Sequence, residues 1–275
     1  MTQAGSSARG AAQSANDSKS LDWLAAAGLV AFGVVHLVLG WLVIQLALGD
    51  REGEASNSGA LAQLAEQPFG KFLVWAIGIG MILLVIWQAI EAAVGHQDEE
   101  GKKRIFKRLA SAGKAIVYAV IAYSAIKIAI GSGSSNSEKG TDSTTAKIMD
   151  LPGGQILVGL IGLGIIGVGI ALLVQAYRES YLKKLDGEGK SGKTGDAYRW
   201  FGRIGHTAKG IALGIVGGLF LYAAISHEPK KSGGMDQALT TVLDQPFGPV
   251  LLILMGLGFI AYGLFCFAWA RHLDR

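Results

Sequence analysis

Five polar side chains fall within long apolar stretches, where they could transfer protons or hold a ligand. They are His36, Tyr118, Glu91, Lys114 and Lys209. Polar groups at membrane depth are costly, so each of the five is a candidate functional residue. The imidazole of His36 could ligate haem or a metal ion, or it could relay protons.

A bis-histidine site is not expected around His36, because the other histidines are predicted to lie at or beyond helix ends. These are His96, His206, His227 and His272. The simpler interpretation is that His36 is a neutral histidine, hydrogen-bonded across helices in a packed interior.

Glu91 is expected near the inner end of its helix, with Lys114 and Lys209 at the same depth. Two interpretations are open. Glu91 could form a structural pair with one of the lysines, whose long side chains can reach toward water. Alternatively, it could act as a gate or proton site at the inner mouth of a central pathway.

The sequence contains no arrangement that indicates an enzyme. A Ser-His-acid set, paired catalytic carboxylates, metal-ligand spacing and a nucleotide-binding loop are all missing. The single cysteine, Cys266, allows neither an intrachain disulfide nor a cysteine metal cluster. We therefore expect no enzymatic activity, no cofactor and no metal. The net charge of +4 is explained by basic loops, so no nucleic acid partner is expected.

Composition and apolar runs indicate a membrane protein. Hydrophobic residues make up 51% of the chain and charged residues only 17%. Six apolar runs approach or exceed the roughly 20 residues that cross a hydrocarbon core. They cover residues 21–48, 69–94, 109–130, 154–176, 204–225 and 247–270. The sequence predicts an all-α integral membrane fold with six transmembrane helices.

A short motif opens the second, fourth and sixth runs. It reads Gln-Pro-Phe-Gly at 67–70 and 245–248, and Leu-Pro-Gly-Gly at 151–154, and a Gly-x-Gly pair follows ten and twelve residues after each proline. The shared positions are Pro68, Gly70, Gly78 and Gly80; Pro152, Gly154, Gly162 and Gly164; and Pro246, Gly248, Gly256 and Gly258. The chain is therefore three copies of one two-helix unit.

The first helices of the units align without gaps when Gly28 is set against Ala110 and Gly205. Small residues recur in this alignment, as is typical of helices that approach closely, so the glycines are interpreted as packing residues rather than a phosphate loop. The same alignment places Phe32, Lys114 and Lys209 at equivalent positions, and one turn later His36, Tyr118 and Leu213.

The repeats define the expected organisation. Residues 1–20 are predicted to be a disordered cytoplasmic tail, followed by repeats at 21–98, 99–185 and 186–275. Since all three repeats run in the same direction, they could surround a pseudo-threefold axis normal to the membrane. Short amphipathic helices are expected in the outer loops, over residues 59–66, 145–150 and 236–244.

Lys and Arg concentrate in the loops that follow the second and fourth runs. Short loops rich in these residues stay in the cytoplasm. We therefore predict a multi-pass plasma-membrane protein with both termini in the cytoplasm. Its basic loops would attract anionic lipid headgroups.

The three units, with their Pro-Phe-Gly and Gly-x-Gly marks and the segment Gly33-Val34-Val35-His36, resemble an actinobacterial membrane family described as domain of unknown function 1206. The resemblance covers nearly everything from Leu21 to Arg275 and implies tandem copies of a two-helix domain. The middle repeat departs most, with Gly153 in place of phenylalanine and Tyr118 in place of His36. The family implies a fold but no activity.

Two functions are weighed. The first is a non-enzymatic accessory or scaffold protein that binds membrane proteins or lipids through glycine-rich faces and basic inner loops. The alternative is a small channel or transporter along the pseudo-threefold axis, lined by His36, Tyr118 and Glu91. A continuous polar lumen would favour the channel, and a closed core would favour the scaffold. A cofactor-binding protein, the third possibility, would absorb visible light.

Overall fold

The computed structural model describes residues 19–49, 55–97, 100–131 and 145–273, so nearly all of the predicted tail lies outside the described residues. The long helices are α2 (Lys19–Ala47), α4 (Gly70–Ala93), α5 (Gly101–Ala129), α7 (Gly154–Arg178), α8 (Gly192–Ser226) and α10 (Gly248–Arg271). Between them lie α3 (Asn57–Glu66), α9 (Met235–Leu243), and the 3-10 turns η1 (Ser180–Lys184) and η2 (Pro229–Lys231). Residues 145–149 are also helical.

All six long helices have the length and composition to cross a membrane, which confirms the predicted all-α integral membrane fold. The three short helices expected between the spans of each repeat are also present. Two long helices, α5 and α8, begin earlier than their apolar runs, at Gly101 and Gly192. In α5 the preceding lysines and arginines are good helix formers. The prediction that His206 lies at a helix end is therefore wrong, since it is well inside α8.

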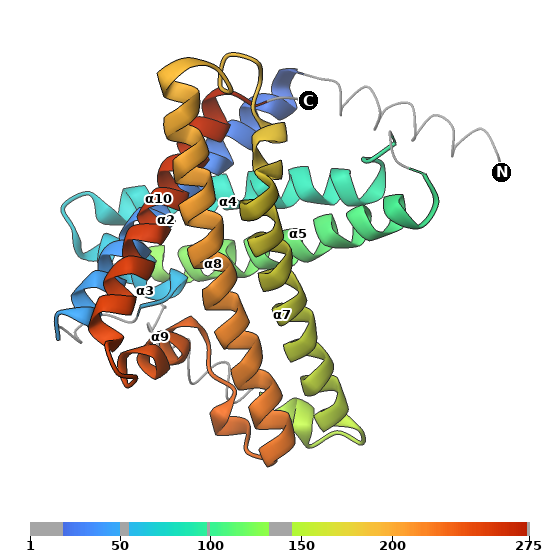
Figure 1. The fold of residues 1–275 in the computed structure, drawn as a ribbon, viewed down its shortest axis with the longest axis vertical. Helices are drawn as coiled ribbons and strands as arrows, with labels where there is room; N and C mark the ends of the chain where they lie inside the picture. The colour runs from blue at the N-terminus through green and yellow to red at the C-terminus, as the bar shows by residue number, and fades with distance from the viewer. Residues whose placement is uncertain (1–18, 50–54, 98–99, 132–144, 274–275) are drawn as a thin grey trace.

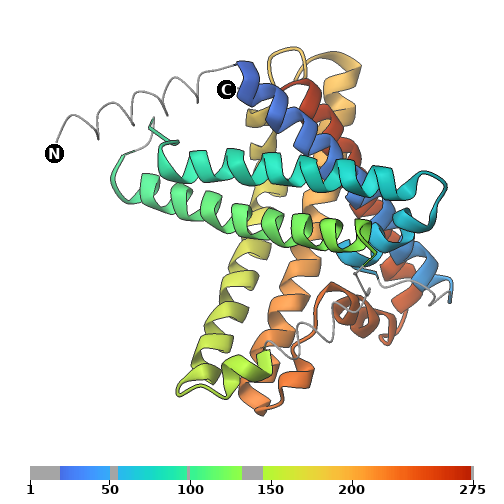
Figure 2. The ribbon, with the colours of Figure 1, turned by 180° about the vertical axis from the view of Figure 1, so that it is seen from behind.

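The long helices pair mainly across the boundaries between repeats. α4 lies along α5, α7 along α8, and α10 returns to lie along α2 (Figures 1 and 2). Within repeats, α2 packs on α4 and α8 on α10, whereas α5 and α7 form no packed pair in the described part of the chain. The figures show α4 and α5 running across the direction of α7 and α8. The expected threefold arrangement thus holds between repeats and is broken inside the middle one.

The first glycine of each Gly-x-Gly pair faces a helix of the following repeat, with the third repeat leading back to the first. A Cβ on Gly162 would lie 2.9 Å from the carbonyl oxygen of Gly217, and one on Gly256 would lie 2.7 Å from that of Gly40. The equivalent position, Gly78, is looser, with its nearest neighbour 3.4 Å away. In lipid, helices associate through such close backbone packing, so two of the three pairs depend on glycine.

The second glycine of each pair faces the first helix of its own repeat. A Cβ on Gly80 would lie 2.7 Å from the Cβ of Ala31, and Gly258 approaches Ala208 more closely still. A Cβ on Gly164, in contrast, would have no neighbour within 4 Å. The third repeat therefore packs tightly at both glycines, the first repeat mainly at the second glycine, and the middle repeat at the first glycine alone.

The proline motif forms the turn that leads from each short outer helix into a spanning helix. In the first repeat the Gly70 N–H donates to the Gln67 carbonyl at 2.7 Å, and the other repeats make the same bond. A Cβ on Gly70 would overlap the carbonyl of Leu64, so glycine is required there. The preceding residue has a positive φ, 62° at Phe69 and 76° at Gly153, and this conformation favours glycine. The backbone conformation at this position therefore suits the glycine that stands in the middle repeat where the other two have phenylalanine.

The two glycines of the middle pair should respond oppositely to substitution. Gly162→Ala places a Cβ against the α8 backbone and is expected to destabilise the protein by about 1–3 kcal/mol, the usual range for overpacking. Gly164→Ala adds a methyl group in open space and is expected to leave stability unchanged or slightly higher. Thermal stability in a mild detergent, followed by size-exclusion chromatography after heating, measures both. Equal losses of stability would contradict this assignment of the two faces.

Candidate functional site

His36 and Lys209 meet at the centre of the molecule. The Nδ1–H group of His36 donates to the carbonyl of Phe32 at 2.9 Å, one turn back on α2. A neutral imidazole has one donor and one acceptor nitrogen, so Nε2 is left to accept from the Lys209 ammonium, 3.3 Å away on α8. His36 is therefore bonded across helices, as the simpler interpretation of the sequence predicted.

The Lys209 ammonium is also held between two aromatic faces. Its Nζ lies 4.6 Å from the ring centroid of Phe32 and 4.2 Å from that of Tyr262. Aromatic faces attract cations, and more strongly where water is excluded. The side chain is half-buried, so the rings and the imidazole replace part of its hydration.

A second lysine, Lys184 in η1, lies over the ring of Trp269, which in turn packs against Trp87. Its Nζ is 4.1 Å from the ring centroid of Trp269, and the rings of Trp269 and Trp87 are 6.2 Å apart. Each indole buries an Nε1–H group that has no hydrogen-bond partner among the described residues. A buried N–H group without a partner costs about 1–3 kcal/mol, so this region has donor capacity that the protein does not use.

Contacts on both sides of Lys184 fix its position. Tyr181, earlier in η1, is fully buried, and its hydroxyl donates to the carbonyl of Arg199 at 2.6 Å. Asp186 follows, with its carboxylate 3.1 Å from Nδ1 of His272 and its N–H donating to the His272 carbonyl at 2.9 Å. The Gly189 N–H and His272 lower the pKa of the Asp186 carboxyl. The segment after α7 is thus tied to the end of α10, which carries Trp269.

Lys114, on α5, is the third cation near the centre. It is exposed, and the carboxylate of Glu91 attracts it from beyond ion-pair distance. Glu91 instead lies 3.6 Å from Nε2 of His96. The expected ion pair between Glu91 and Lys114 or Lys209 is therefore not formed, because Glu91 turns toward the end of its own helix.

We call Lys114, Lys184 and Lys209 the central cationic cluster. No carboxylate of the described residues lies within ion-pair distance of any of them. Burial, with the charge of Lys114 and more weakly that of Lys209, lowers the pKa of Lys184 to about 7. Lys184, acted on by the charges of Lys114 and Lys209 and without a carboxylate partner among the described residues, is suited to an anion.

Aromatic rings fill the region where a lumen was expected. The ring centroid of Phe32 lies 4.3 Å from that of His36, 5.2 Å from Tyr118 and 6.1 Å from Tyr262. All four side chains are buried. Of the residues expected to line a path, His36 and Tyr118 come together, while Glu91 lies apart beside His96.

Sequence reasoning missed two members of this region. Lys184 was one basic loop residue among many, and no local signal distinguishes it from the exposed Lys183 beside it. His206 was placed at a helix end, whereas it is buried and stacks on Tyr181 with ring centroids 4.8 Å apart. The residues from Gly192 to Arg203 include three glycines and gave no strong signal that α8 begins before its apolar run.

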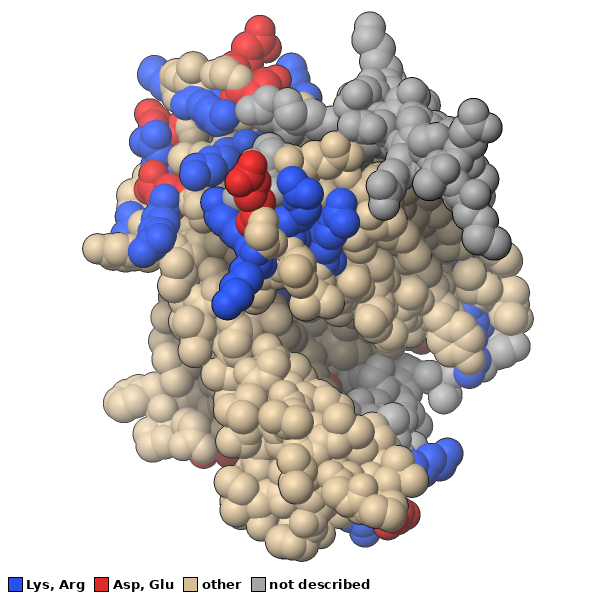
Figure 3. Space-filling view, turned by 90° about the vertical axis from the view of Figure 1, so that its right-hand side faces the viewer, with Lys and Arg blue, Asp and Glu red and all other residues tan. Residues whose placement is uncertain are grey.

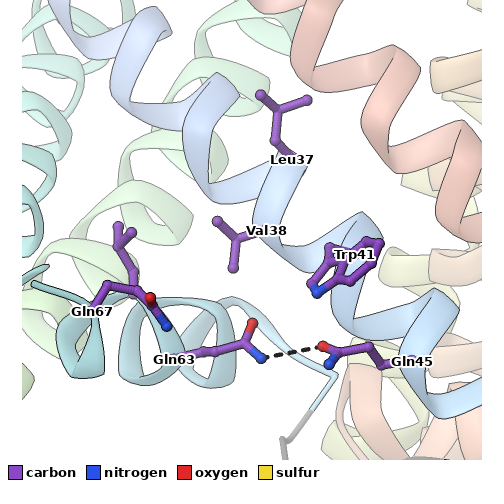
Figure 4. Close-up of a pocket in the computed structure, with 7 residues that line it drawn as sticks. Leu37, Val38, Trp41, Gln45, Gln63 and Gln67 are labelled. Carbon is purple, nitrogen blue, oxygen red and sulfur yellow. Dashed lines mark hydrogen bonds between the residues drawn. The ribbon is translucent and has the colours of Figure 1, made fainter.

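A separate open pocket lies between α2 and α3, toward the end of α2 that is remote from the cluster (Figure 4). It is lined by Leu37, Val38, Trp41, Gln45, Gln63, Leu64 and Gln67. The Gln63 amide donates to the Gln45 oxygen at 3.2 Å, so these two side chains are hydrogen-bonded to each other. Among the described residues, no group of three or more His, Cys, Asp or Glu side chains could hold a metal ion. The central cationic cluster is the stronger candidate site.

The electrostatics of the cluster predict an unusual titration of Lys184. Its amine should be charged below about pH 7 and neutral above it, far from the usual lysine value near 10.4. Lys114→Gln removes a repelling charge and is expected to raise the pKa of Lys184. Carbon-13 NMR of reductively methylated protein measures this titration, with Lys127→Gln, near the other end of α5, as the control. Titration of Lys184 together with the surface lysines would contradict the prediction.

Comparisons with known proteins agree with the repeat structure. The chain matches the family described as Domain of Unknown Function (DUF1206) three times, over residues 27–95, 109–179 and 204–272. It is 32% identical over 239 residues to the uncharacterized protein YxxB of Bacillus subtilis (strain 168), and the match covers 86% of each chain. This relative lends no support to an actinobacterial restriction of the family. No solved structure matches the chain. With three tandem copies across its length, this multi-pass membrane protein belongs to the Domain of Unknown Function (DUF1206) family.

Proposed function

We propose that the protein is a non-enzymatic accessory protein of the plasma membrane that binds anionic lipid at the central cationic cluster. The observation that carries the proposal is that the Lys184 and Lys209 ammonium groups lie over buried aromatic rings with no carboxylate of the described residues at ion-pair distance. The charge of Lys114 also acts on Lys184. Lipid phosphates are the most abundant anions at the membrane surface. The unused indole N–H groups of Trp87 and Trp269 offer further donors to such a ligand.

The charge distribution supports this proposal. On the face that Figure 3 draws, most Lys and Arg side chains gather in the upper part, interspersed with Asp and Glu, above a broad uncharged surface. Exposed cations at the start of α5, and in the α7–α8 connection and the first turn of α8, include Lys102, Lys103, Lys183, Lys190 and Lys193. By the preference of basic loops for the cytoplasm, both termini are cytoplasmic in this proposal. The basic loops would hold anionic lipid close to the cluster.

Two features weigh against the other functions. The rings of Phe32, His36, Tyr118 and Tyr262 are buried and packed together, which leaves little support for a polar path lined by His36 and Tyr118. Many glycines that could have formed a face for partner proteins are used inside the chain, as in the α7–α8 and α2–α10 contacts. Lipid binding therefore has more support than either a transport path or glycine-mediated scaffolding.

Removal of one cluster charge should reduce bound anionic lipid. Protein purified in a mild nonionic detergent is expected to retain anionic phospholipid in excess over its share of the membrane. Lys209→Gln should cut this retained lipid several-fold, because the amide carries no charge to pair with phosphate. Quantitative lipid extraction with mass spectrometry gives the ratio of lipid to protein.

Lys127→Gln is the matched control, because Lys127 is also a half-buried lysine near an aromatic ring, 5.5 Å from the centroid of Tyr123. It should retain anionic lipid as the unmodified protein does. Lys184→Gln repeats the test from a different element. Retained lipid with no anionic excess, or equal losses in Lys209→Gln and Lys127→Gln, would refute lipid binding at the cluster.

The proposed orientation can be tested with reporter fusions. Green fluorescent protein at the C-terminus should fluoresce, since it folds in the cytoplasm, and alkaline phosphatase at the same place should be inactive. Alkaline phosphatase inserted in the connection over residues 132–144 should be active. The opposite pattern would place the basic loops and the cluster on the outer side.

A further inference from the structure

The open pocket between α2 and α3 is built from two rows of side chains that face each other. The row on α2 is Leu37, Trp41 and Gln45, which are spaced four residues apart and so share one face of the helix. The row on α3 and its C-cap is Gln63 and Gln67, with the same spacing. The pocket has a volume of about 520 Å³, within the range of about 300–1,000 Å³ that is usual for small-ligand sites.

The polar side chains of this pocket keep hydrogen-bonding groups for a ligand. One N–H of Gln63 donates to the Gln45 oxygen at 3.2 Å, while the Gln63 oxygen and the Gln67 amide have no partner among the described residues. The Trp41 ring is 54% exposed, and its N–H likewise has no partner in the described part of the chain. In Figure 4 the Gln67 amide extends toward Gln63. All of these groups are neutral, and none of the residues that line the pocket is charged.

The packing of the repeats does not require this set of polar side chains. The third repeat has Gly218 at the position of the tryptophan and Thr241 at the position of Gln63. Its motif glutamine, Gln245, donates to the carbonyl of Thr241 at 3.2 Å. The same two-helix unit therefore forms without an aromatic ring and without a second amide at these places, so the set in the first repeat calls for another explanation.

The hydroxyl groups of a sugar ring match these donors and acceptors. An amide presents a donor and an acceptor side by side, and each hydroxyl can donate and accept, so one glutamine can bind two neighbouring hydroxyls. An indole offers an apolar face on which the apolar side of a sugar ring can pack, and its N–H adds a donor. A phosphate group would call for a cation, and no lysine or arginine lines the pocket.

The depth of the pocket along α2 indicates a ligand that also has an apolar part. The membrane-spanning part of α2 covers Ala25–Ala47. Gln45 lies at the end of this span, at the depth of lipid headgroups. Leu37 and Val38 line the other end of the pocket, are half-buried, and lie well within the span, at the depth of acyl chains. The polar and apolar ends of the pocket thus follow the polar and apolar layers of a lipid.

We infer that this pocket binds the sugar headgroup of a neutral glycolipid. The sugar ring would lie against Trp41, with its hydroxyls on the amides of Gln63 and Gln67. The acyl chain would begin along Leu37 and Val38. This site goes beyond the proposed function, because it is remote from the central cationic cluster and takes an uncharged headgroup.

Native mass spectrometry can compare two lipids that differ only in the sugar. The full-length protein is purified in a polyoxyethylene detergent, because detergents with sugar headgroups would compete. It then receives an equimolar mixture of diacylglycerol and monoglucosyl diacylglycerol with the same chains, and, in a parallel run, the monogalactosyl lipid. At least one glycosyl lipid is expected to be bound about tenfold more than diacylglycerol, since several hydrogen bonds distinguish them. Trp41→Ala and Gln67→Ala change exposed side chains and should each reduce this preference about threefold or more.

Each variant has a matched control in the same chain. Trp75→Ala removes an indole of α4 that is 42% exposed, similar to Trp41. Gln245→Ala changes the glutamine of the third repeat that corresponds to Gln67. Both controls should keep the preference of the unmodified protein. Equal losses in Trp41→Ala and Trp75→Ala, or in Gln67→Ala and Gln245→Ala, would overturn the assignment of the sugar to this pocket.

Two further measurements separate the sources of the sugar and the two lipid sites. Displacement of the glycosyl lipid by an equal concentration of methyl glucoside or methyl galactoside, which have no chain, would make this a site for a soluble saccharide and overturn the inference. Equal binding of glycosyl lipid and diacylglycerol would overturn it as well. Lys209→Gln should leave the glycosyl preference unchanged, so failure of this inference and failure of the proposed function are distinguishable.

Discussion

Direct backbone contact between helices is the interaction on which this fold depends. In a bilayer the lipid chains are as apolar as the side chains, so helices gain little from hydrophobic burial and associate through close packing. The α2–α10 pair shows this along its length, since a Cβ on Gly33 would lie 2.9 Å from the Gly263 carbonyl, and Gly40 faces Gly256 in the same way. This pair joins the first repeat to the third, and so closes the chain on itself.

The repeats also explain why the charges converge. Phe32, Lys114 and Lys209 occupy equivalent positions of the three first helices, so threefold organisation brings them toward one axis. Three lysines there would repel one another at high cost. Phenylalanine at the first position removes one charge and offers its ring to Lys209, 4.6 Å from the centroid. Lys184, which is not at an equivalent position of the repeats, adds a third positive charge. This added charge is consistent with the binding of an anion.

Much of this structure could be predicted from the sequence, because membrane helices and repeats leave strong local signals. The spans follow from apolar length, and the turns from Pro68 and its equivalents. The open middle repeat could not be predicted, since Gly164 has the same motif as Gly80 and differs only in what lies opposite. The position of Lys184 depends on the tie between Asp186 and His272, which are far apart in the sequence.

The central cationic cluster has two ways to relieve its electrostatic cost, and they oppose each other. Loss of the Lys184 proton, favoured by burial and by the charges of Lys114 and Lys209, removes one positive charge. A bound anion compensates the charge instead, and therefore favours the protonated amine. By linkage, an anion that prefers the charged form raises the pKa of Lys184 and is bound with uptake of a proton where that amine is otherwise neutral. Such a site holds its anion more firmly as the pH falls toward 7, so Lys184, which has no equivalent in the other repeats, would make occupancy depend on pH.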